Sequence, residues 1–289
     1  MFVSGFTFIR NAVKYDYPVV ESITSILPLV DEMIVAVGNS EDETRQLIEQ
    51  INSPKIKIID TVWDDSLREG GRVLAVETNK AFDAVSEKAD WCFYIQADEA
   101  VHEKDYNAIR NAMLLHKDNE QVQGLLFNYM HFYGSYDFIG DSRRWYRQEI
   151  RIIKNDKAIR SFRDAQGFQR KGKRLRVKNA NASIYHYGWV KPPEKQMAKR
   201  KDFEKLWHDT NYVEKKYSNK DTFDYSQVDA LKYFTGTHPK VMQKRINSIN
   251  WKFDFDPTQK NLSIKLKVLH AIESLTGWRI GEYKNFRKV

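Results

Sequence analysis

The first 116 residues alternate short apolar runs with stretches whose apolar residues recur at helical spacing. The apolar runs lie at residues 2–9, 33–38, 55–63 and 91–96. Because they do not alternate apolar with polar side chains, we expect strands buried on both faces, as in a parallel sheet between helices. Helices are predicted at residues 18–30, 40–51, 70–85 and 102–116, the second with Ser40 as N-cap and Glu43 completing a capping box. This order predicts an α/β fold with a mostly parallel, Rossmann-like sheet flanked by helices.

The second half of the chain follows a different pattern. Further strands are predicted at residues 124–134, 148–154 and 182–189, and a charged helical segment at residues 192–217. Residues 262–275 carry apolar side chains at helical spacing, and Gly277 is the expected C-cap of that helix. We therefore expect a main domain over residues 1–190 and a basic, largely helical C-terminal extension over residues 191–289.

Composition and net charge limit the expected partners and the cellular compartment of the protein. The formal net charge of +8 suits an anionic partner such as phosphate, nucleic acid or an acidic membrane surface. Cys92 is the single cysteine, so no disulfide can form within the chain and a reducing compartment is expected. The N-terminus has no basic region before its apolar run, and no stretch approaches the ~18 apolar residues of a membrane span. We expect a cytoplasmic protein, with the inner face of the membrane as one possible location.

Two adjacent carboxylates, Asp98 and Glu99, follow the fourth apolar run in the sequence YIQADEA. In open α/β sheets, ligands bind outside the carboxyl ends of the strands. Divalent cations such as Mn²⁺ and Mg²⁺ prefer oxygen ligands and often bridge a carboxylate to substrate phosphates. Asp98 is therefore a candidate metal ligand, and a solvated strand end is the alternative.

Other polar side chains are expected at the same edge of the sheet. They follow the four strands or open the helix after the third strand, and Arg68 has the charge to reach a phosphate. For Asp65 and Arg68 a surface salt bridge is the alternative. The candidate substrate-binding residues are Thr7, Arg10, Asn39, Asp65, Arg68, Asn79 and Gln96.

The element order, with SEDET after the second strand and QADE after the fourth, resembles the family two glycosyltransferases of the GT-A fold. The resemblance covers residues 2–116 well and residues 117–190 loosely. In that family a strand ends in an Asp-x-Asp-type motif whose last aspartate binds a metal ion on the donor diphosphate. The resemblance implies that residues 1–190 form a catalytic domain that binds a nucleotide-sugar, with Mn²⁺ or Mg²⁺ on Asp98. Gln96 stands where the first aspartate of the motif usually lies.

The resemblance also implies a late histidine and a catalytic base. His186, in IYHYGW, is the candidate for a histidine that returns to the metal or the diphosphate, and a packed core histidine is the alternative. Inverting transfer needs a carboxylate that takes the proton of the acceptor hydroxyl. Asp164 is the candidate base, and Asp141 and Glu149 lie in the same window of the sequence.

Two basic segments remain. Residues 169–178 form either a solvated hairpin, a mobile loop over the diphosphate, or a contact with a phosphorylated or lipid-linked acceptor. The tail, residues 278–289, mixes basic residues with Trp278 and Tyr283, which suits a peripheral contact with a membrane surface. A packed terminal segment is the alternative for the tail.

The sequence thus predicts a metal-dependent inverting glycosyltransferase, hexosyltransferase-like, with a nucleoside-diphosphate sugar as donor and a saccharide or lipid-linked hydroxyl as acceptor. The resemblance implies bacterial polysaccharide or lipopolysaccharide biosynthesis as its context. A sugar nucleotidyltransferase is one alternative, but Gly5 is the only glycine near the first strand and lies inside it. A non-catalytic nucleotide-sugar or nucleic-acid binder is another; no nucleic-acid-binding motif is recognised, so nucleic acid is not an expected partner.

Overall fold

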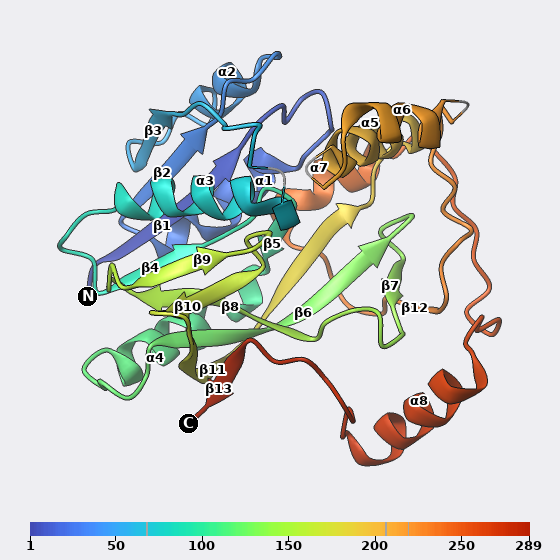
Figure 1. Ribbon diagram of the computed structural model, residues 1–289. Helices are drawn as coiled ribbons and strands as arrows, with labels where there is room; N and C mark the ends of the chain where they lie inside the picture. The colour runs from blue at the N-terminus through green and yellow to red at the C-terminus, as the bar shows by residue number, and fades with distance from the viewer. Residues whose placement is uncertain (68, 206, 219) are drawn as a thin grey trace.

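The computed structural model describes residues 1–67, 69–205, 207–218 and 220–289. Its N-terminal half is a parallel sheet in the order β3-β2-β1-β4, with a helix in each connection (Figure 1). The strands are β1 (Val3–Ile9), β2 (Glu32–Val37), β3 (Ile56–Asp60) and β4 (Trp91–Tyr94). The helices are α1 (Val19–Ile26), α2 (Thr44–Glu49) and α3 (Arg72–Asp83). The predicted α/β arrangement of this half is confirmed.

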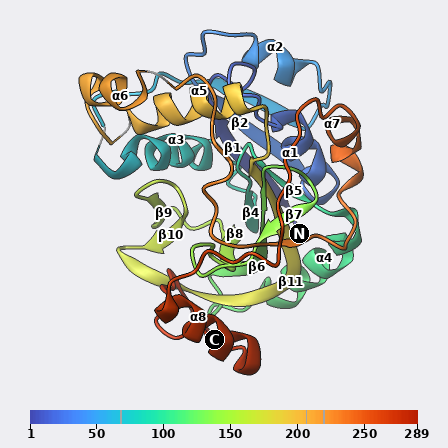
Figure 2. The ribbon, with the colours of Figure 1, turned by 90° about the vertical axis from the view of Figure 1, so that its right-hand side faces the viewer.

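Apolar residues fill both faces of this sheet. In β4, Trp91 and Phe93 belong to the core under α1 and α4 (Tyr106–His116), whereas Cys92 and Tyr94 belong to the core under α3. Successive side chains of a strand point to opposite faces, so a strand covered on both sides carries no polar position. The missing alternation in the sequence therefore reflects a sheet between two layers of helices (Figure 2).

Beyond β4 the sheet becomes mixed. Strand β8 (Gln148–Lys154) runs antiparallel to β4, β6 (Gly124–Tyr133) antiparallel to β8, and β11 (Lys173–Trp189) parallel to β6. Shorter strands complete it: β5 (Glu99–Val101), β7 (Phe138–Gly140), β9 (Ile159–Phe162), β10 (Gly167–Arg170), β12 (Leu231–Tyr233) and β13 (Phe286–Lys288). The basic residues 169–178 lie on the antiparallel β10–β11 hairpin.

After β11 the chain is mainly helical. It forms α5 (Pro193–Glu204), α6 (Thr210–Tyr217), α7 (Gln243–Asn247) and α8 (Ile264–Thr276) before β13 returns to pair with β11. Helix α8 ends at Gly277 in the left-handed conformation, as predicted. In the described part of the chain, no helix combines the length and apolar character needed to cross a membrane.

Two local predictions are wrong. The third strand ends at Asp60 instead of residue 63, and α2 begins at Thr44 without a capping box. The Asp42 carboxylate accepts the Thr44 backbone N–H at 3.1 Å, whereas Ser40 Oγ accepts the Asn11 N–H at 3.0 Å. Ser40 therefore fixes the loop after β1 instead of starting the helix.

Candidate active site

A cavity of about 840 Å³ opens beside the carboxyl ends of β1 and β4. Strand β1 lies between β2 and β4, so the chain goes from β1 toward one edge of the sheet, to β2, and from β4 toward the other edge, to β6. Such a switch point leaves a crevice at the carboxyl edge. Helix α5 supplies much of the wall facing the sheet edge. The predicted site residues that line the cavity are Arg10, Asp65, Gln96, Asp98, Asp164 and His186.

Three other predicted residues lie outside the cavity lining. Thr7 is buried within β1. Asn39 Oδ1 accepts the Trp63 backbone N–H at 3.2 Å. The Asn79 amide donates to Ser161 O at 3.2 Å and accepts from Ser161 N at 2.9 Å, which ties α3 to β9. Arg68 is outside the described residues.

Asp98 lies between β4 and β5 and faces cations from the C-terminal half. Its Oδ2 accepts a hydrogen bond from Lys199 Nζ of α5 at 3.1 Å, and Lys199 also donates to Gly188 O at 3.2 Å. Burial is the largest influence on the Asp98 pKa and alone would raise it. The positive charge of Lys199, which also donates a hydrogen bond to the carboxylate, outweighs burial and holds the pKa of Asp98 well below its usual range. Asp98 is therefore ionised at neutral pH.

Glu99, the neighbouring carboxylate, points away from the cavity. Its oxygens accept from Arg151 Nη2 at 2.6 Å and Arg151 Nε at 2.9 Å, and Tyr129 Oη donates to the same carboxylate. Both side chains of the ion pair are completely buried. The Arg151 guanidinium also lies over the rings of Tyr94 and Tyr129. The two acidic residues of the motif thus have separate surroundings: Asp98 faces the cavity and Glu99 a buried arginine.

A chain of hydrogen bonds assigns the tautomer of His186. His131 Nε2 lies 3.0 Å from the Tyr146 carbonyl oxygen, and His131 Nδ1 lies 3.2 Å from His186 Nδ1. Burial is the main cause that lowers the pKa of both histidines, so both are neutral at pH 7. The carbonyl can only accept, so His131 carries its hydrogen on Nε2 and accepts from the N–H at His186 Nδ1. This leaves a bare lone pair on His186 Nε2.

That lone pair and the Asp98 carboxylate converge. His186 Nε2 lies 3.7 Å from Asp98 Oδ2, with no hydrogen between them in the assigned tautomer. A β-carbon built on Gly188 would lie 2.6 Å from each of these two atoms, so any side chain at this position would displace the pair. Neighbouring ligands in the octahedral shell of Mg²⁺ lie about 3 Å apart, so a small side-chain rotation brings the pair to that spacing.

These residues fit an ion that shares its shell with substrate oxygens. The described residues hold no group of three or more His, Cys, Asp or Glu side chains that suits a metal. Mg²⁺ in particular is usually bound through one or two carboxylates together with substrate phosphates. The Lys199 ammonium already contacts Asp98, so it has to share this carboxylate with any ion that binds there.

Asp164 lines the cavity from the turn between β9 and β10. Its neighbours Arg163 and Ala165 have φ angles of 54° and 62°, so a left-handed residue on each side aims the exposed Asp164. Gln96 Nε2 donates to Ala165 O at 3.3 Å and so connects the turn to the end of β4. Asp141 lies elsewhere, paired with Lys260 at 2.7 Å.

Glu149, the third candidate base, is buried in β8 and does not line the described cavity. Asn285 Nδ2 donates to its Oε2 at 2.9 Å. Burial is the largest influence on its pKa and raises it from 4.5 to about 7. This carboxyl holds its proton more tightly when folded, so its stabilising effect is complete below about pH 4.5 and is lost as the pH rises to about 7.

Glu149→Gln should remove this pH dependence, because glutamine resembles the protonated side chain in shape. At pH 8 we expect the variant to exceed the wild type in free energy of unfolding by about 2 to 3 kcal/mol, and at pH 4.5 to match it. Urea unfolding of both proteins at the two pH values measures the difference. A difference that stays constant with pH would show that Glu149 titrates normally.

Sequence reasoning missed several residues of the site. Lys199, Tyr146 and Trp189 line the cavity, and the buried Lys191 donates to Tyr15 O at 2.8 Å beneath it. Residues 192–217 were recognisable only as a charged helical segment, and no spacing marked Lys199 among its many lysines. His131 lies in a strand rich in aromatic residues, and the sequence around it does not predict a role in the site.

No protein-family model and no curated protein matches the sequence. Among solved structures, Mycobacterium tuberculosis glucosyl-3-phosphoglycerate synthase with Mn²⁺, uridine diphosphate and phosphoglyceric acid is 17% identical, with a TM-score of 0.31. That match covers 45% of this chain and 43% of the synthase chain, less than half of its length. S. aureus TarS 1–349 with UDP is 14% identical, with a TM-score of 0.41 over 79% of this chain and 69% of that chain. At these identities and TM-scores the function has to be argued from the site itself.

Proposed function

We propose that this protein is a metal-dependent inverting glycosyltransferase. It moves a sugar, a hexose in the simplest case, from a nucleoside-diphosphate donor to a hydroxyl of a saccharide or lipid-linked acceptor. The observation that carries the proposal is the convergence of the Asp98 carboxylate and the His186 Nε2 lone pair in a large cavity at the switch point of the sheet. Asp164 lines the same cavity and supplies a carboxylate separate from this pair.

The charges of the cavity support a role for a divalent cation. Among the described residues that line it, five side chains are basic and six are acidic. A diphosphate would add two or more negative charges to a wall without a positive excess. Asp98 and His186 would hold a Mn²⁺ or Mg²⁺ ion, which would supply the missing positive charge beside the leaving diphosphate.

Other side chains of the cavity have separate roles in the proposed reaction. Lys199, held between Asp98 and the Gly188 carbonyl, places a second positive charge beside the leaving diphosphate. Arg10 at the end of β1 and Asp65 after β3 form an ion pair at 3.0 Å on the side of the cavity where we place the nucleoside. Asp164 accepts the proton of the acceptor hydroxyl as that oxygen attacks the anomeric carbon.

The test is donor hydrolysis and binding with a panel of UDP-, GDP- and dTDP-sugars, with Mn²⁺ and with chelator. We expect slow, metal-dependent release of nucleotide from one donor, because water can replace the missing acceptor. Metal-dependent binding without release would mean that turnover requires the acceptor, which is then supplied as a mixture of saccharides. Absence of binding to every donor would overturn the proposal.

His131 should control the metal affinity of His186 without touching the ion. His131→Phe removes the acceptor for the His186 Nδ1 hydrogen, so this hydrogen is free to move to Nε2 and block the lone pair. Loss of such an orienting partner typically costs about 10- to 100-fold in metal affinity. Calorimetric titration with Mn²⁺ in the presence of UDP measures the affinity, and ¹⁵N NMR of the metal-free imidazoles reports the tautomer.

His131→Asn is the matched control, because its amide oxygen can occupy the place of Nδ1 and accept the same hydrogen bond. We expect the asparagine variant to retain the tautomer and most of the affinity that the phenylalanine variant loses. Equal Mn²⁺ affinities in both variants and in the wild type would contradict the assignment.

A further inference from the structure

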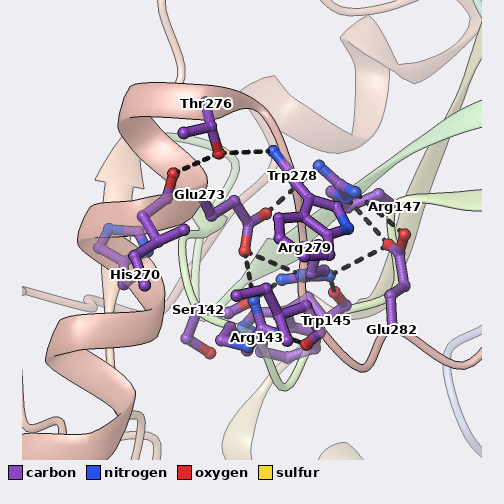
Figure 3. A network of polar contacts seen from close by, with 12 residues as sticks. Ser142, Arg143, Trp145, Arg147, His270, Glu273, Thr276, Trp278, Arg279 and Glu282 are labelled. Carbon is purple, nitrogen blue, oxygen red and sulfur yellow. Dashed lines mark hydrogen bonds and ion pairs between the residues drawn. The ribbon is translucent and has the colours of Figure 1, made fainter.

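Helix α8 is held against the body of the protein by one polar face. Glu273 accepts from Arg143 Nη1 and from Arg279 Nε, each at 3.0 Å, and lies 3.3 Å from Arg147 Nη1 (Figure 3). Arg279 is nearly buried and donates to Trp145 O at 2.7 Å and to Ser142 O at 2.9 Å. These contacts fix the rotation of the helix, so its outer face is defined.

The outer face of α8 is an apolar stripe. Ile264, Val268, Ala271 and Leu275 are all exposed, and the three larger side chains have exposed fractions of 83%, 55% and 86%. At 3.6 residues per turn these positions lie within about 60° of one another, opposite Glu273. Trp278, just past the helix, is also exposed, with an exposed fraction of 65%. Most soluble helices carry such a stripe toward the core, whereas here it faces outward.

The charges around the stripe are basic. Lys265 and Lys267 are exposed and flank it on its two sides. The acidic residues of segment 260–289 are Glu273 and Glu282, and both are engaged by arginines on the inner face. Exposed basic side chains continue to the C-terminus at Lys284, Arg287 and Lys288. The outer surface of this segment therefore presents apolar and positively charged groups without an exposed carboxylate.

We propose that α8 docks this protein onto an anionic lipid bilayer, with the helix parallel to the membrane surface. The stripe enters the boundary between headgroups and acyl chains, while Lys265 and Lys267 extend to the headgroups. A second copy of the chain fits less well, because face-to-face stripes would bring lysines against lysines. Helix α8 lies at the periphery of the molecule (Figures 1 and 2). Docking of α8 onto a membrane does not depend on the reaction that takes place in the cavity.

The test is flotation of the full chain with vesicles of phosphatidylcholine alone and of phosphatidylcholine with phosphatidylglycerol. We expect binding to the anionic vesicles and a strong decrease at high salt. Ile264→Ser with Leu275→Ser should lower the bound fraction at least about tenfold, and Lys265→Ala with Lys267→Ala about fivefold. Circular dichroism and unfolding curves establish that the variants remain folded.

Matched controls carry equally exposed residues from other elements. Val62→Ser with Leu115→Ser removes two apolar side chains that are 72% and 76% exposed, and Lys215→Ala with Lys244→Ala removes two exposed lysines. Both controls should bind as the wild type does. Wild-type protein that floats with neither vesicle, or stripe and control variants that bind alike, would overturn the proposal. A concentration-dependent dimer that is lost in the stripe variant would assign the face to a second copy instead.

Discussion

Replacing Asp98 with asparagine is expected to lower sugar transfer, measured as kcat/KM for the donor, by about a hundred- to a thousandfold. The variant keeps the shape of the side chain and loses the charge that pairs with Lys199 and that would bind a divalent ion beside His186. The variant should also lose about 1 to 3 kcal/mol of stability, because the mostly buried Lys199 ammonium loses its counter-ion and keeps only its contact with Gly188 O.

Asp60→Asn is the matched control. Asp60 ends β3, the edge strand of the parallel half, pairs with Arg45 at 3.2 Å and lies outside the described lining of the cavity. It should retain wild-type transfer. Calorimetric titration with Mn²⁺ and UDP measures metal binding separately, and we expect it to weaken in Asp98→Asn alone. Transfer within about threefold of wild type in Asp98→Asn would remove Asp98 from the mechanism.

Chelator distinguishes two roles for the cations around Asp98. If wild-type transfer stops with chelator and Lys199→Met reduces it only in part, a divalent ion supplies most of the charge on the diphosphate. If transfer survives chelator and is lost in Lys199→Met, the lysine supplies that charge and Asp98 only holds it in place. The 3.1 Å contact between Lys199 and Asp98 makes both outcomes chemically possible, and we expect the first.

The sequence predicted the parallel half of the fold because its inner strands β1, β2 and β4 are buried on both faces. Trp91 to Tyr94 is apolar at every position, and this pattern excludes a strand with one wet face. The carboxyl edge of the sheet follows from the chain direction, and the sequence alone therefore places Arg10, Gln96 and Asp98 at the same edge. The mixed half was not predictable in the same way, because the pairing of β8 with β4 depends on contacts between distant segments.

The contacts between residues of the site could not be predicted from the sequence for the same physical reason. Asp98 and Lys199 are separated by 101 residues, and His131 and His186 by 55 residues. No local pattern specifies which of many lysines or aromatic neighbours will meet a given carboxylate. The different surroundings of Asp98 and Glu99 also depend on the fold, because Asp98 lies in a turn and Glu99 begins β5.

Glu99→Gln is expected to lower the free energy of unfolding by about 3 to 5 kcal/mol. The substitution leaves the Arg151 guanidinium charged, completely buried and without its counter-ion. Arginine cannot release its proton to escape this cost. The carbonyl oxygens of Ile150 and Gln166, at 2.9 and 3.2 Å from Arg151 Nη1, compensate only in part. Glu99 is the next residue after Asp98, but we expect its substitution to affect stability and not sugar transfer.

Urea unfolding of Glu99→Gln, Arg151→Met and the double variant forms a cycle that isolates the ion pair. Once the arginine is gone, Glu99→Gln should cost much less, because a buried pair that is replaced as a whole often leaves stability nearly unchanged. We therefore expect the double variant to be more stable than either single variant. If Glu99→Gln lowers the unfolding free energy by less than about 1 kcal/mol, Arg151 is neutralised by other groups and the carboxylate does not hold this part of the core together.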